Sequence, residues 1–296
     1  MKRIFFSCLT LLIAFAASAQ TDVEFKRTED VIYGRRPGVA LTLDVFQPAK
    51  PNGYGLALMV SGGWFSSHEA INSGFIQVFL NRGYTVFAVV HGSQPKYVVT
   101  EITEDIHRAI RFIRHNAAKY DIKPDHLGIL GASAGGHLSL TMGVRGGPGP
   151  GDAKDPVARE SSAVQAIACF FPPTDFLNYG KPGEDAVGIG ILKDFQPAFG
   201  PESATAEGRQ RLGREISPIY WVNSKLPPTL IIHGDADKLV PIQQAETFVA
   251  KAKEAGATAK LVVKPGKQHG WPDLPQDLPT LADWFDQYLR GLPPAR

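Results

Sequence analysis

A serine, an aspartate and a histidine each follow a separate apolar run of the sequence and could act as one chemical unit. Ser133 lies in Gly131-Ala-Ser-Ala-Gly135, directly after the apolar residues 127–130. A serine hydroxyl is a poor nucleophile at neutral pH, so it needs a histidine to take its proton and a carboxylate to orient that histidine. Asp237 and His269 follow two later apolar runs. Together the three residues would suit acyl transfer through a covalent intermediate.

The small residues around Ser133 have a steric explanation. The pattern G-x-S-x-G is typical of a sharp turn between a strand and a helix, in which the serine takes a strained backbone conformation and small neighbours let the two elements approach closely. Residues 127–130 predict that strand, and residues 134–142 predict that helix. The turn would present the Ser133 hydroxyl at the carboxyl end of the strand.

Other polar residues compete for these roles. Asp235 lies in the same segment as Asp237 and is an alternative carboxylate, although it could instead cap the turn. His233 is expected to support a loop backbone, and His107 is expected on a solvated helix surface. Asp175 is expected to anchor a loop or to line a pocket.

Apolar runs and helical patterns alternate along most of the chain. Strands are predicted over residues 41–46, 56–60, 84–90, 127–130, 164–171, 229–232 and 260–263. Helices are predicted over residues 102–117, 242–252 and 281–289, with Pro241 in the first turn of the second helix and Gly256 and Gly291 after the last two helices. This alternation predicts an α/β fold in which helices cover both faces of a mostly parallel sheet.

Two stretches interrupt this alternation. Residues 146–160 are rich in Gly, Pro and charge, and residues 172–214 have no clear period. Long irregular segments in compact domains are usually functional or mobile, so residues 172–214 are a possible cap over a pocket. We expect residues 20–296 to form a single domain that includes this insertion.

The first residues have the pattern of a secretory signal peptide. Lys2 and Arg3 precede the apolar residues 9–15, and the small residues 17–19 resemble a cleavage site, so cleavage is expected after Ala19. The apolar run is too short for a membrane anchor. The sequence therefore predicts a secreted or periplasmic protein.

The expected mature chain carries no net charge. Removal of residues 1–19 takes away two of the 31 basic residues and none of the 29 acidic ones. Nucleic-acid and anionic-membrane partners both require a basic surface, so neither is expected. Cys169 would be the one remaining cysteine, and its apolar surroundings indicate a buried thiol.

Three spaced motifs resemble those of a known family. They are Ser61-Gly-Gly-Trp64, Gly131-Ala-Ser-Ala-Gly135 with Gly136-His137-Leu138, and His233-Gly-Asp-Ala-Asp237 followed by His269-Gly270. The chain resembles an α/β-hydrolase of the secreted carboxylesterase or acetylesterase type, similar to the hormone-sensitive-lipase-like group and to the catalytic domain of prolyl oligopeptidases. The resemblance implies an α/β-hydrolase fold with a sheet of about eight strands. It also implies Ser133 as nucleophile, Asp237 rather than Asp235 as the orienting carboxylate, and His269 as base.

The resemblance further implies an oxyanion hole, in which backbone N–H groups stabilise the negative oxygen of the reaction. Gly62, Gly63 and Ala134 are expected to supply these groups. The sequence lacks the histidine that usually precedes the glycines of this loop. Depending on the alignment, Val60 or Ser61 takes its position, and in the second case Trp64 becomes a donor.

The loss of that histidine leaves the support of the loop open. His68 and His91 are the candidates to replace it. The aromatic residues Trp64 and Trp271 are expected to contact substrate, and no metal or other cofactor is expected, because the histidines show no metal-binding spacing.

The function expected from these features is hydrolysis of carboxylic esters by a secreted serine esterase. Export and the resemblance favour small acyl groups, acetyl or feruloyl, on carbohydrate. Two alternatives remain: a serine peptidase of the prolyl-oligopeptidase type, and a non-catalytic binding module with the same fold.

Overall fold

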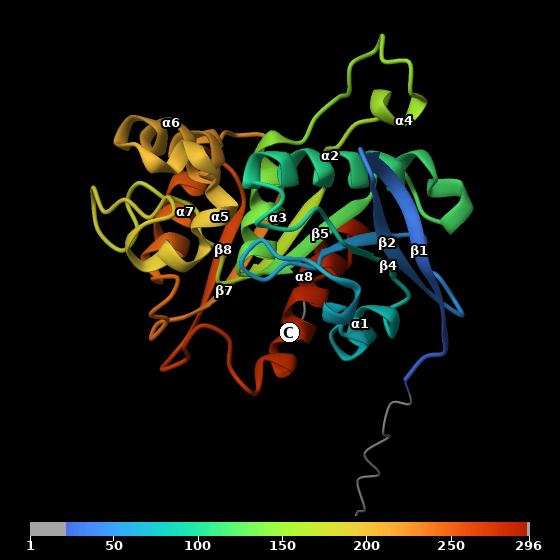
Figure 1. The fold of residues 1–296 in the computed structure, drawn as a ribbon. Coiled ribbons are helices and arrows are strands. Elements are labelled where there is room, and N and C mark those ends of the chain that lie inside the picture. The colour runs from blue at the N-terminus through green and yellow to red at the C-terminus, as the bar shows by residue number, and fades with distance from the viewer. Residues whose placement is uncertain (1–21, 295–296) are drawn as a thin grey trace, which may run out of the picture.

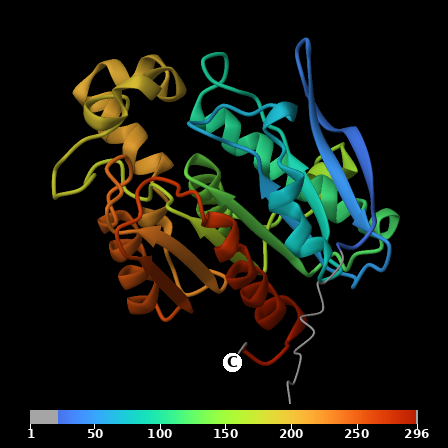
Figure 2. The same cartoon turned by 90° about the horizontal axis from the view of Figure 1, so that it is seen from below.

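A twisted eight-stranded sheet forms the centre of the molecule in the computed structural model, which describes residues 22–294 (Figures 1 and 2). The expected signal peptide, residues 1–19, lies outside the described residues. The strands are β1 (Phe25–Arg36), β2 (Val39–Pro48), β3 (Gly55–Met59), β4 (Thr85–Val89), β5 (Leu127–Ala132), β6 (Ala166–Phe170), β7 (Thr229–Gly234) and β8 (Ala259–Lys264). Their order is β1-β2-β4-β3-β5-β6-β7-β8.

Six of these strands are parallel to one another. From β4 across β3, β5, β6 and β7 to β8, all neighbours pair in parallel, whereas β2 is antiparallel to both β1 and β4. The carboxyl ends of the parallel strands therefore meet at one edge of the sheet. Loops that leave this edge can bring distant residues together.

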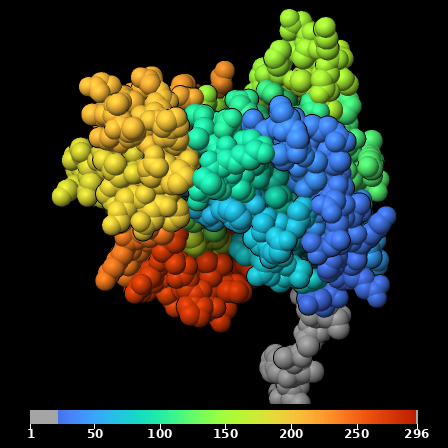
Figure 3. Space-filling view, viewed as in Figure 1, coloured from blue at the N-terminus to red at the C-terminus, as the bar shows by residue number. Residues whose placement is uncertain are grey.

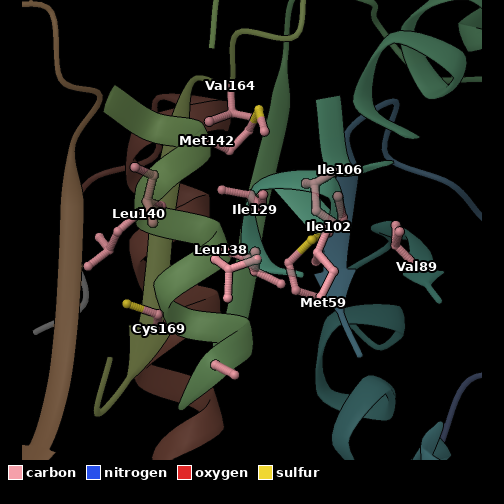
Figure 4. Close-up of a cluster of buried hydrophobic side chains, with 14 of the residues drawn as sticks. Met59, Val89, Ile102, Ile106, Ile129, Leu138, Leu140, Met142, Val164 and Cys169 are labelled. Atoms are coloured by element: carbon pink, nitrogen blue, oxygen red, sulfur yellow. The ribbon is translucent and has the colours of Figure 1, made fainter. Parts of the chain in front are cut away.

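Helices cover both faces of the sheet and bury two apolar layers. One layer packs α2 (Val99–His115), α3 (Ala134–Arg145) and α7 (Gln243–Glu254) against the sheet, and Figure 4 shows part of it. The other layer packs α1 (Ser73–Leu80) and α8 (Leu278–Arg290). Alternate residues of β3 enter different layers, Ala57 and Met59 the first and Leu56 and Leu58 the second. Because both faces are covered, the parallel strands inside the sheet, β3 to β7, are largely apolar.

The predicted α/β fold is confirmed, although helix α1 was not predicted and two other elements need correction. β1 was not predicted, because its residues are mostly exposed and polar and the strand lies at the edge of the sheet. Helix α7 begins at Gln243, so Pro241 precedes the helix and is not in its first turn. Gly291 takes a left-handed conformation, with φ of 69°, directly after α8, as expected for a helix-terminating glycine.

Residues 172–214 contain more helix than their sequence suggests. They include η3 (Gly190–Phe195), α5 (Gln196–Phe199), η4 (Pro201–Ala204) and most of α6 (Ala206–Ile216). Asp175 anchors the start of the segment, since its buried carboxylate accepts hydrogen bonds from the Leu177 N–H and the Tyr220 hydroxyl. Residues 146–160, by contrast, protrude from the body of the molecule and carry the short helix α4 (Pro156–Arg159) (Figure 3).

Candidate active site

Ser133 occupies the turn between β5 and α3, and its backbone is strained. Its φ and ψ are 54° and −121°, in a region that residues with a side chain seldom adopt. A Cβ added at Gly131 would lie 2.5 Å from the Gly135 backbone, and one added at Gly135 would lie 2.6 Å from the Met59 carbonyl. The turn therefore has no room for larger neighbours, which explains the small residues on both sides of the serine.

His269 bridges Ser133 and Asp237. Its Nε2 lies 2.9 Å from the Ser133 Oγ, and its Nδ1 lies 2.8 Å from the Asp237 Oδ2. A hydrogen bond from Nδ1–H to the carboxylate leaves Nε2 free to accept the serine proton. The three residues, which follow β5, β7 and β8, thus meet at the carboxyl edge of the sheet.

The environment of Asp237 keeps its carboxylate charged. Burial on its own would raise the pKa of Asp237, but hydrogen bonds from His233, His269 and the Val240 N–H hold that pKa well below its usual range. The Leu239 and Val240 N–H groups both donate to Oδ1 at 2.9 Å.

The alternative carboxylate, Asp235, lies apart from His269. Asp235 is exposed and accepts a hydrogen bond from the Gly266 N–H at 2.6 Å. The described structure pairs His269 with Asp237 alone.

His233 supports the loop that carries Asp237. Its ring is fully buried, and Nε2 lies 2.8 Å from the Val240 carbonyl and 3.3 Å from the Asp237 Oδ2. A proton on Nε2 can be donated to both acceptors. The expected support of a loop backbone is therefore present, together with a contact to the carboxylate that the sequence did not indicate.

Two of the three expected oxyanion donors lie beside Ser133. Gly63 and Ala134 line the same small cavity as the serine, and among residues 22–294 neither N–H group has a hydrogen-bond acceptor. The expectation for Gly62 is wrong, because its N–H donates to the Phe65 carbonyl at 2.9 Å within the turn of the loop. Gly63 needs to be glycine: its φ is 55°, and an added Cβ would lie 2.4 Å from the Phe195 ring.

The cavity beside Ser133 is very small, about 10 Å³. This is about the space that one water molecule requires. Its other walls are apolar or aromatic, formed by Trp64, Pro173, Tyr179, Leu192, Phe195, Leu239 and Val240. Several of these residues belong to the 172–214 segment, whose irregular sequence offered no signal that would have singled them out.

The two tryptophans expected at the substrate have different positions. Trp64 lines the cavity, although its indole is almost fully buried and donates to the His137 Nδ1 at 3.2 Å. Trp271 does not line the cavity, because its ring packs against Phe170 and its Nε1–H donates to Asp277. Substrate contact at Trp271 therefore stays a prediction.

His91, not His68, contacts the loop of residues 60–66 that carries Gly63, the expected oxyanion loop. The His91 Nε2 lies 2.8 Å from the Ser61 Oγ, within the loop itself. His68 instead contacts Thr42 and Asp30, on the first two strands. The expectation for His107 is also wrong: it is buried and lies 2.8 Å from the Ser162 Oγ.

A larger surface cavity lies elsewhere and offers no comparable chemistry. It has a volume of about 730 Å³, lies between β1 and α2, and has no serine, cysteine or histidine in its lining. Cys169 is fully buried, and burial raises the pKa of its thiol. Among residues 22–294, no group of three or more His, Cys, Asp or Glu could hold a metal ion. No helix in this part of the chain is long and apolar enough to span a membrane.

The model of the BD-FAE family, which is of the α/β-hydrolase type, matches residues 43–252. The chain belongs to this family. The match includes Ser133 and Asp237 and ends before His269. The resemblance to α/β-hydrolases noted in the sequence is thereby confirmed.

Two relatives of this BD-FAE protein are esterases of Mycobacterium tuberculosis. Esterase LipQ is 28% identical over 195 residues, 64% of this chain and 43% of LipQ. Esterase LipC is 26% identical over 247 residues, 81% of this chain and 59% of LipC. The chain thus spans about half the length of these curated relatives.

Solved structures resemble the BD-FAE protein over more of its length. A truncated form of a carbohydrate esterase from gut microbiota is 27% identical, with a TM-score of 0.77, and the match covers 91% of this chain and 98% of that one. A bifunctional GH43-CE protein of Bacteroides eggerthii is also 27% identical, with a TM-score of 0.73, covering 88% of this chain and 38% of that one.

Proposed function

We propose that the protein is a serine esterase that removes short acyl groups, such as acetyl, from carbohydrate through an acyl-enzyme. The observation that carries this proposal is the continuous hydrogen-bonded chain from Ser133 through His269 to Asp237. The N–H groups of Gly63 and Ala134, which have no acceptor in the described part of the chain, lie beside it. This combination suits attack on a carbonyl, because it both activates the alcohol and stabilises the oxyanion.

The reaction would proceed in two stages. As the Ser133 Oγ bonds to the ester carbonyl carbon, its proton moves to the His269 Nε2, and the carbonyl oxygen becomes an oxyanion facing the N–H groups of Gly63 and Ala134. The C–O bond then breaks, and His269 returns the proton to the departing alcohol. Water, deprotonated by His269, attacks the acyl-enzyme in the same way and releases the acid. Asp237 keeps His269 in the required tautomer throughout.

The size of the cavity supports a short acyl chain. A space of about 10 Å³ suits one methyl group, whereas a longer chain, or the ring of a feruloyl group, would require the wall to move. Carbohydrate as the alcohol is supported by the printed name of one similar structure, the truncated carbohydrate esterase from gut microbiota.

Three measurements test the proposed function together. The purified protein should hydrolyse p-nitrophenyl acetate faster than the butyrate ester, release acetate from acetylated xylo-oligosaccharides, and be labelled by a fluorophosphonate at Ser133. The Ser133→Ala variant should lose all three properties. Faster turnover of an aminoacyl p-nitroanilide than of the acetate ester would instead indicate a peptidase. A wild-type protein that resists the fluorophosphonate would indicate a binding module.

We also propose that residues 1–19 are a signal peptide and that the mature protein acts outside the cytoplasm. The charged start, the apolar middle and the small residues at 17–19 support this proposal. Recovery of exported protein whose first residue is Gln20 would agree with it. Protein that stays in the cytoplasm with its first residues intact would contradict it.

A further inference from the structure

The oxyanion loop is attached to a histidine outside the loop. His91, just after β4, is 3% exposed, and its Nδ1 lies 2.7 Å from the Gly92 carbonyl. Because Nδ1–H donates to that carbonyl, Nε2 carries no proton and accepts the hydrogen bond of the Ser61 hydroxyl at 2.8 Å. The Nδ1 side of the ring is therefore fixed to the backbone of the next residue, and the Nε2 side holds the loop through Ser61.

Serine side chains form a second attachment between the same two segments. The Ser66 N–H donates to the Ser93 Oγ at 2.8 Å, and the Ser93 hydroxyl donates to the Ser66 carbonyl at 2.7 Å. The Ser66 hydroxyl in turn contacts the Val60 carbonyl. Both the start and the end of the loop are thus joined to residues 91–93, with Gly63 between them.

The segment that holds the loop is itself fixed from behind. The Gly92 N–H donates to the Asp105 Oδ2 at 3.0 Å, and Arg36 donates to the Asp105 Oδ1 at 2.8 Å. An added Cβ at Gly92 would lie 2.6 Å from the Tyr97 ring, so the backbone is closely enclosed. His91 is therefore a rigid support rather than a mobile side chain.

We propose that His91, acting through Ser61, is a positioning residue that holds the Gly63 N–H in place for the oxyanion. This inference rests on the proposed esterase function. The loop has no histidine of its own to support it. His91, which follows the neighbouring strand β4, supports the loop instead. The negative charge on the oxygen develops only in the transition state, so a displaced N–H should reduce kcat with little change in KM.

The molecule offers a matched control for this histidine. His107 is also buried and also lies 2.8 Å from a serine hydroxyl, that of Ser162. Ser162 lies before the start of β6, whereas Ser133 lies at the carboxyl edge of the sheet, so this second pair is remote from the site. Substitution of either histidine removes a similar buried hydrogen bond, but only the His91 pair contacts the oxyanion loop.

The test compares kcat and KM for p-nitrophenyl acetate in His91→Ala, His91→Gln and His107→Ala. His91→Ala should lower kcat about tenfold or more and keep KM within about twofold. His91→Gln should recover most of kcat, since its amide oxygen can accept from Ser61. His107→Ala should leave both constants within about twofold, even where its melting temperature falls as far as that of His91→Ala.

A second variant guards against failure of His91→Ala to fold. Ser61→Ala removes the hydroxyl that contacts His91 and keeps the imidazole, and it should also lower kcat. The double variant should be no slower than His91→Ala alone, because the two groups act as one unit. Equal kcat in Ser61→Ala and wild type, or equal loss in His91→Ala and His107→Ala, would overturn the inference. Absence of turnover by the wild-type protein would overturn the proposed function, and this inference with it.

Discussion

Asp235 and Asp237 lie two residues apart in one loop, and of the two only Asp237 contacts His269. Asp237→Asn should lower kcat for p-nitrophenyl acetate about 10³- to 10⁴-fold, because an amide cannot hold His269 in the tautomer that accepts the serine proton. Asp235→Asn is the matched control, since the Asp235 carboxylate is exposed and accepts a hydrogen bond from the Gly266 N–H, whereas His269 pairs with Asp237. Its kcat should stay within about threefold of wild type. A larger loss in the control than in Asp237→Asn would contradict the assignment.

The positions of residues were predictable where a motif fixes the backbone. They were not predictable where a side chain or an N–H group has more than one available hydrogen-bond partner. Ser133, Asp237 and His269 each follow a strand, so the topology brings them to one edge. Gly62 and Gly63 are identical in type, and only the fold of the loop determines that the Gly62 N–H donates to the Phe65 carbonyl. The direction of the Trp271 indole depends likewise on Asp277, which no local pattern indicates.

At the scale of elements, η3 of the 172–214 segment shapes the cavity beside Ser133. Leu192 lines this cavity, whereas the preceding Ile191 is 43% exposed and does not. Leu192→Ala should therefore enlarge the space and raise the ratio of kcat/KM for p-nitrophenyl butyrate over that for the acetate about tenfold. Ile191→Ala should leave the ratio unchanged. An unchanged ratio in Leu192→Ala would mean that the acyl chain does not enter this cavity.

Elements were predictable to the extent that each has a periodic apolar pattern of its own. Five of the six parallel strands are buried on both faces, so their sequences are nearly continuous apolar runs, whereas β8 at the edge is partly exposed. β1 shows no such run, since it lies at the edge and pairs only with β2. Helix α6 carries charge on most of its surface and buries only a few residues, so its period is hard to recognise from sequence.

Three of the four histidines that the described structure buries make the stability of the protein sensitive to acid. Burial lowers the pKa of His91, His107 and His137 to about 4 in each case. In the unfolded chain a histidine has a pKa of about 6.5, so between these values the unfolded chain binds more protons and the folded state loses stability as the pH falls. The melting temperature should therefore fall by about 10 °C between pH 7 and pH 4.5.

The contribution of one histidine can be separated. His107→Gln, which is remote from Ser133, should reduce the pH dependence of the melting temperature by about a third, because one of three similar groups is removed. A melting temperature that does not change over this pH range would contradict the shared role of the three rings.

The unusual backbone of Ser133 has a consequence for the protein as a whole. With φ at 54°, any residue that has a side chain destabilises the folded state here, and glycine does not. The free energy of unfolding of Ser133→Gly should therefore exceed that of Ser133→Ala by about 1 kcal/mol, although both variants lack the hydroxyl. Ser133→Gly should accordingly have the higher melting temperature. Thermal denaturation of the two inactive variants measures the difference directly. If Ser133→Gly is the more stable of the two, then selection has kept a residue that reduces stability at this position, because the serine hydroxyl is needed for the reaction.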